Sequence, residues 1–150
     1  MRLRVSVVIS LLLIQAMLPL LNAIYSKFTS DATLVAAFPG GLHRDRAPEG
    51  TAMPYVVSHV VSSQSEFYYG ATSRTHVQVR FNAYGIGHDA CGALLETFIS
   101  HFDQALLTLS SGSNDSVVRL SDAAPALHRH DAQGNDVWEW SVTYEYAVTN

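Results

Sequence analysis

Two segments of the chain alternate strictly between apolar and polar residues. In the segment 75–84 the apolar residues are Val77, Val79, Phe81 and Ala83. In the segment 138–148 they are Trp138, Trp140, Val142, Tyr144, Tyr146 and Val148, with Glu139, Ser141, Thr143 and Glu145 between them. Successive side chains of a strand point to opposite faces, so each segment predicts a strand with one covered and one wet face. A sheet with a wet face is typically antiparallel.

Helical periodicity appears before and between these strands. Apolar residues recur three and four apart over residues 19–29, and again in a long stripe from Leu94 to Leu109. We expect Gly112, Ser113 and Asn114 to end the long helix. A second short helix is predicted over 31–38, because Pro39-Gly40-Gly41 follows it. The sequence therefore predicts two helices before the first long strand and a third helix in the middle of the chain.

The other extended segments complete a sheet. Pro54 can open a strand but cannot lie inside a central one, so a β-branched strand is predicted over 55–63, after a brief pairing segment at 42–46. Segments 116–120 and 126–130 are predicted strands, separated by a turn or bulge at 122–125. A hairpin loop at 131–135 leads into the last strand. The predicted fold class is α+β, an antiparallel four- to five-stranded sheet with helices packed on one face.

Composition limits the classes of partner. A chain of 150 residues with 48% apolar content can bury one ordinary core, so one domain is expected. Charged residues make up 15% and the net charge is −4, which argues against a general nucleic-acid-binding surface. The single cysteine, Cys91, excludes an internal disulfide.

The first residues need a separate interpretation. Arg2 and Arg4 precede an apolar run, and Ala16 or Ala23 could close a cleavage site, as in a secretory signal peptide. Polar residues and Pro19 interrupt the run, which makes a membrane span less favoured. A third interpretation is that translation starts at Met17. We therefore separate residues 1–16, a signal-like or mis-annotated extension, from a single α+β domain over 17–150.

No catalytic, cofactor or metal site is predicted. His128 and His130 are two apart on a strand, a geometry that zinc sites use, but a third ligand must come from elsewhere. We favour two histidines on a solvent-facing sheet surface. Cys91 lies near a helix start, where the dipole can lower a thiol pKa, but free cysteines are more often small core residues. The chain is therefore predicted not to be an enzyme.

The segment between the first two long strands, Gln64–Arg74, is long for a hairpin turn. It contains Phe67, Tyr68 and Tyr69 between polar residues, and a local hairpin cannot bury all three. Exposed aromatic clusters mark interfaces, although this one can equally fold back on its own sheet. The candidate interface residues are Phe67, Tyr68, Tyr69 and Arg74.

The order of these elements resembles a known family. An amphipathic first helix leads through Asp31-Ala-Thr-Leu-Val-Ala-Ala to Ala47-Pro-Glu-Gly-Thr-Ala-Met-Pro-Tyr-Val-Val57. The strand Val77-Gln-Val-Arg-Phe-Asn-Ala-Tyr84, an Ala/Leu-rich helix and a closing hairpin into Trp138-Glu-Trp-Ser-Val-Thr-Tyr-Glu-Tyr146 follow. Over residues 17–150 the chain resembles the tail-completion, or tail-terminator, proteins of long-tailed bacteriophages, similar to the minor tail protein U group.

The resemblance implies a non-enzymatic subunit of a ring, typically a hexamer. Such a ring caps the tail tube and joins it to the head, so the implied partners are further copies of the chain, the tail tube protein and the head-tail connector proteins. DNA would pass through the lumen without specific binding, and an acidic subunit suits that passage because carboxylates repel phosphates. The implied location is the virion, at the tail's head-tail interface, after assembly in the host cytoplasm.

The N-terminus departs from this family, because a tail protein has no use for an export signal. The alternative function is an exported binding module of the cell envelope, with the N-terminal segment removed as a signal peptide.

Overall fold

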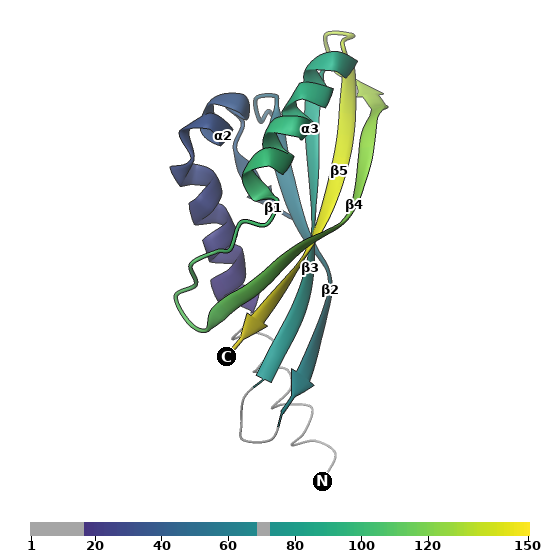
Figure 1. Cartoon of the computed structure of the whole chain (residues 1–150). Helices are drawn as coiled ribbons and strands as arrows, with labels where there is room; N and C mark the ends of the chain where they lie inside the picture. The colour runs from purple at the N-terminus through teal and green to yellow at the C-terminus, as the bar shows by residue number, and fades with distance from the viewer. Residues whose placement is uncertain (1–16, 69–72) are drawn as a thin grey trace.

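The computed structural model describes residues 17–68 and 73–150. The signal-like segment 1–16 and the candidate residue Tyr69 lie outside the described residues. Residues 17–30 are helical, and the labelled elements that follow are α2 (Ala32–Ala37), β1 (Leu42–Arg44), β2 (Tyr55–Phe67), β3 (Ser73–Ile86), α3 (His88–Phe102), β4 (Ser113–His130) and β5 (Asp136–Thr149) (Figure 1). None of the described helices is long and apolar enough to cross a membrane.

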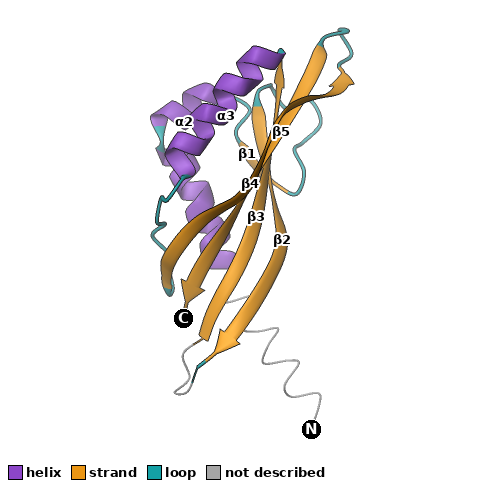
Figure 2. Cartoon of the chain, turned by 45° about the vertical axis from the view of Figure 1, so that its right-hand side comes forward, coloured by secondary structure: helices purple, strands orange, loops and turns teal. Residues whose placement is uncertain are grey.

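One five-stranded sheet carries the fold, with the strand order β1-β2-β3-β5-β4. All neighbouring strands are antiparallel except β1 and β2, which are parallel over Leu42–Arg44 and Val56–Ser58. The helices lie together on one face of the sheet (Figure 2). The predicted α+β class with helices on one face is confirmed, and the parallel pair is the exception to the predicted antiparallel sheet.

The core lies between the helices and the inner face of the sheet. On β3 the side chains of Val77, Val79, Phe81 and Ala83 are fully buried, and on β5 those of Trp140, Tyr144 and Tyr146 are at most 1% exposed. Phe98 and Phe102 of α3 stack on each other with ring centroids 4.4 Å apart, and Phe98 contacts both Phe81 and Trp140. The alternation seen in the sequence therefore marks the covered face of each strand correctly.

The predicted end of the long helix is wrong. α3 stops at Phe102, because Asp103 has an extended backbone and Gln104 has a φ of 55°. The Asp103 carboxylate accepts a hydrogen bond from the hydroxyl of Tyr144 at 2.7 Å and lies 3.6 Å from Arg119. These contacts come from β5 and β4, so they hold the chain out of the helix in spite of the apolar spacing that continues to Leu109.

β4 is one strand of 18 residues, not two. The predicted break at 122–125 is a bulge, seen as a register shift between Ala123 and Ala126. Pro125 is tolerated inside β4 because the strand lies at the edge of the sheet, where one side needs no ladder hydrogen bonds.

Asp31 caps the short helix α2. Its carboxylate accepts hydrogen bonds from the amides of Thr33 and Leu34, at 3.0 and 3.2 Å, and from His101 of α3 at 2.6 Å. Burial opposes ionisation of Asp31, but the Leu34 amide, the His101 ring and the Thr33 amide outweigh it and hold the pKa below the ordinary 3.8. Asp31 therefore joins the start of α2 to the end of α3.

Replacing this cap is expected to destabilise the protein in a pH-dependent way. Asp31→Ala should lower the free energy of unfolding by about 1 kcal/mol near neutral pH, the usual value of an N-cap. Because the folded-state pKa is depressed, the contribution of the charge is present above the ordinary value of 3.8 and is lost as the pH falls through the lower folded value. Urea denaturation at neutral and acidic pH checks this. An equal deficit at both pH values would contradict it.

Candidate interface at the hairpin end of the sheet

The hairpin end of the sheet brings three candidate residues together. Glu66 pairs with Arg74 and Phe67 with Ser73, so β2 and β3 stay paired as far as Phe67 and Ser73. The strands thus extend into the segment Gln64–Arg74, beyond the predicted strand end at residue 63. Its polar residues have cross-strand partners that a search for apolar runs misses, such as the Ser65 and Thr75 hydroxyls, 3.0 Å apart.

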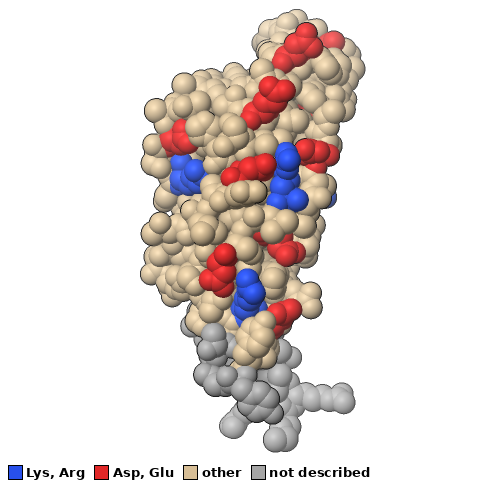
Figure 3. Space-filling view, in the orientation of Figure 1, with Lys and Arg blue, Asp and Glu red and all other residues tan. Residues whose placement is uncertain are grey.

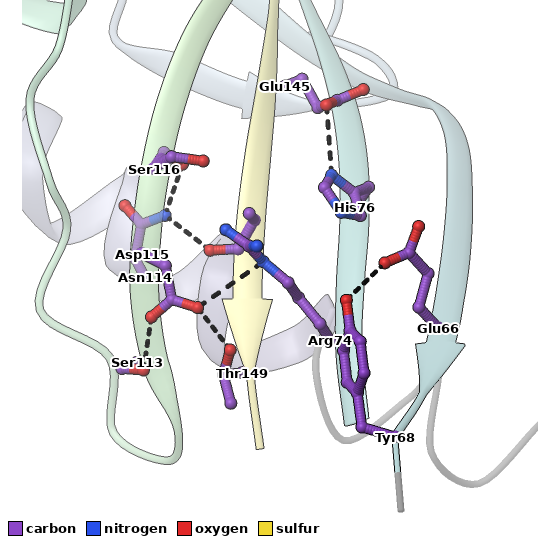
Figure 4. A network of polar contacts seen from close by, with 11 residues as sticks. Glu66, Tyr68, Arg74, His76, Ser113, Asn114, Asp115, Ser116, Glu145 and Thr149 are labelled. Carbon is purple, nitrogen blue, oxygen red and sulfur yellow. Dashed lines mark hydrogen bonds and ion pairs between the residues drawn. The ribbon is translucent and has the colours of Figure 1, made fainter. Parts of the chain in front are cut away.

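Phe67 and Tyr68 present aromatic surface to solvent at this end. Their exposed fractions are 57% and 53%. The Tyr68 hydroxyl donates a hydrogen bond to Glu66 at 2.8 Å (Figure 4). That bond and the charge of Glu66 raise the pKa of Tyr68, and Arg74 acts in the opposite direction. Two aromatic side chains are thus exposed at this end of the sheet, and their part in an interface stays a prediction.

Arg74 reaches across the sheet toward β4. Its Nε lies 3.8 Å from a carboxylate oxygen of Asp115. Asp115 also accepts hydrogen bonds from Thr149 and from Ser113, and these, with the charge of Arg74, lower its pKa (Figure 4). Arg74 therefore connects β3 to β4 inside the subunit. Its part in an interface stays a prediction.

Asn114 is a site residue that sequence reasoning missed. It is 8% exposed, and its side-chain oxygen accepts from the amide of Leu107 at 2.9 Å. Its side-chain nitrogen donates to the carbonyls of Ser116 and Ala147, at 2.9 and 3.1 Å. Asn114 thereby fixes the loop after α3 to the edge of the sheet. An Asn directly after Gly112-Ser113 is the available sequence signal, since such residues hydrogen-bond nearby backbone groups.

Two glutamates of β5 organise the sheet face that the helices leave open. Glu145 accepts hydrogen bonds from His76 and Gln78, each at 3.2 Å. Glu139 accepts from Asn82 and from Tyr84, and lies 2.9 Å from His128. Burial and the nearby carboxylate raise the pKa of Tyr84 to about 12. This face is polar and partly exposed, although Thr143 and Ala147 of β5 are buried in it.

The histidines weighed as metal ligands have carboxylate partners instead. His128 pairs with Glu139 at 2.9 Å and His130 with Asp136 at 2.8 Å. Within residues 17–68 and 73–150, no cluster of three His, Cys, Asp or Glu side chains is arranged to hold a metal ion. Cys91 is fully buried, and its burial raises the pKa of the thiol, which agrees with the interpretation of a core residue.

Comparison with solved structures finds the same fold in another protein. The fold is shared with a virion protein. The chain is similar to one from a structure described as the virion of a native gene transfer agent (GTA) particle, with a TM-score of 0.65 and 14% sequence identity. The match covers 92% of this chain and 98% of that chain. No protein-family model and no curated protein matches the sequence.

Proposed function

We propose that the chain is a non-enzymatic structural protein of a phage-type virion, a ring-forming tail terminator that caps the tail tube and joins it to the head. The observation that carries the proposal is the fold shared with a gene transfer agent virion chain over nearly the full length of both. The order of elements, which resembles the tail-terminator family, supports the finer assignment.

The surface suits assembly. Phe67 and Tyr68 are exposed at one end of the sheet, where they can contact the tail tube or a neighbouring subunit. Acidic side chains are spread over the face shown in Figure 3, with Lys and Arg between them. The net charge of −4 suits a lumen that passes DNA without holding it. The proposed partners are therefore further copies of the chain, the tail tube protein and the head-tail connector proteins.

The proposal is tested with the full-length chain. Light scattering and negative-stain imaging should show closed rings, alone or on added tail tubes from the phage or gene transfer agent particle that carries the protein. Binding of rings to the ends of tubes is the expected result. A protein that stays monomeric and also fails to bind tail tubes would overturn the proposal.

The aromatic residues give this test a matched variant. The double replacement Phe67→Ala and Tyr68→Ala should weaken binding to tail tubes about tenfold or more, because buried aromatic anchors carry much of an interface's energy. The control is Tyr25→Ala, which removes another exposed aromatic ring, 48% exposed on the first helix. Equal binding by both variants in a pelleting assay would show that the hairpin end is not part of the interface with the tail tube.

The start of the mature chain separates this proposal from the export alternative. Intact-mass measurement of the cellular protein should find a chain that begins at Met1 or Met17. A chain that begins at Ile24, the product of cleavage after Ala23, would favour the envelope module instead. Translation from Met17 and cleavage after Ala16 give the same chain, so removal of the Met1 codon separates them: only translation from Met17 still yields the protein.

A further inference from the structure

The sheet has two free edges on opposite sides. β4 pairs with β5 on one side only, and β1 covers β2 only at Val56–Ser58. Among the described residues, no backbone hydrogen bond reaches the outer side of β2 beyond Ser58 or the outer side of β4. In Figure 2 the lower halves of β2 and β4 form the two borders of the sheet.

The two free edges occupy the same position along the strand direction. Following the pairing across β3 and β5, His59 of β2 is level with Ser121 of β4. In the same way, Glu66 is level with Ser113. The free part of β2 and the first half of β4 therefore have equal lengths and the same position along the sheet.

Strand direction makes the two edges complementary. β2 is antiparallel to β3, β3 to β5 and β5 to β4, so β2 and β4 run in opposite directions. A second copy in the same orientation beside the first places its β2 antiparallel to the first copy's β4. The hydrogen-bond ladder can then continue from one subunit into the next.

Exposed apolar side chains lie along both edges. On β2, Val61 is 47% exposed and Phe67 is 57% exposed; on β4, Val118 is 50% exposed and Leu120 is 46% exposed. A long free edge with apolar side chains is an aggregation hazard, which monomeric proteins block with proline or a covering segment. Toward the other end, β1 covers β2 and Pro125 interrupts β4. The halves at the hairpin end carry bulges, between Val60 and Ser62 on β2 and between Asn114 and Ser116 on β4, but among the described residues no backbone segment pairs with their outer sides.

We propose that residues 59–67 of one copy pair antiparallel with residues 113–121 of the next, which makes the sheet continuous between subunits. The contact joins two different surfaces, so repeating it gives a ring when the rotation between subunits closes, whereas a two-fold contact would stop at a dimer. This inference rests on the proposed ring and names the contact that builds it.

Cross-linking of the full-length chain tests the pairing. Ser62, Gln78, Glu145 and Val118 form one row across the sheet, and both end residues of the row are exposed. With a short bismaleimide, the double variant Ser62→Cys and Val118→Cys should give a ladder of covalent oligomers. Each single variant alone should stay uncross-linked, and a mixture of the two should give dimers. The buried Cys91 is present in every sample, so the wild-type chain controls for it.

A second pair controls for random collision. Ser62→Cys with Ser100→Cys places one thiol on the β2 edge and the other on the exposed side of α3, and should give no ladder. Rings that form without cross-links would overturn the strand pairing and leave the tail-terminator proposal standing. Dimers from either single variant alone would indicate a two-fold contact and also overturn it. Cross-linked oligomers that fail to bind tail tubes would support the pairing and count against the tail role.

Discussion

Phe98→Ala is expected to lower the free energy of unfolding by about 3–5 kcal/mol, the range for removing a buried phenylalanine. Phe98 is fully buried and is the meeting point of the aromatic core. Its ring lies 4.4 Å from Phe102, 5.0 Å from Phe81 and 5.4 Å from Trp140, centroid to centroid. The variant therefore opens a cavity where α3 meets both β3 and β5.

Thermal and urea denaturation measure this effect. At about 2–4 °C per kcal/mol for a chain of this size, the melting temperature should fall by roughly 10 °C. The control is Leu106→Ala, since Leu106 is 62% exposed and its replacement should change stability by less than about 0.5 kcal/mol. Similar losses from both variants would contradict this account of the core.

Gly40→Ala should destabilise the protein by about 3 kcal/mol, the upper part of the range for overpacking. A β-carbon at Gly40 would meet the carbonyl oxygen of Ala52 and lie 2.8 Å from the β-carbon of Tyr55. The backbone is held here, because the Gly40 amide donates to the Pro54 carbonyl at 3.1 Å and the Val56 amide donates to the Gly41 carbonyl at 2.9 Å. The variant thus disturbs the point where β2 begins.

A second glycine provides the matched control. Gly92 lies within α3, and a β-carbon there meets nothing within 4 Å. Gly92→Ala should therefore stabilise the protein by about 0.5–1 kcal/mol, as expected for glycine in a helix interior. Circular dichroism melts of both variants give the comparison. A Gly40→Ala protein as stable as the wild type would show that this close approach has no energetic importance.

The candidate site was only partly predictable from the sequence. Three consecutive aromatic residues between polar ones cannot all be buried by a local hairpin, and Phe67 and Tyr68 are indeed exposed. The contact of Arg74 with Asp115 and the three hydrogen bonds of Asn114 join segments far apart in the chain. No local pattern encodes such contacts, because each partner has an ordinary neighbourhood in the sequence.

Local sequence patterns were enough to predict which faces of β3 and β5 are covered and where β2 begins. Alternation and the fixed φ of Pro54 act on neighbouring residues, so these features need no contact with distant segments. No local pattern predicts that α3 ends at Phe102, that β1 lies parallel to β2 or that two sheet edges are free. Those features depend on contacts between distant segments, such as Tyr144 with Asp103, whose energy exists only once the sheet has formed.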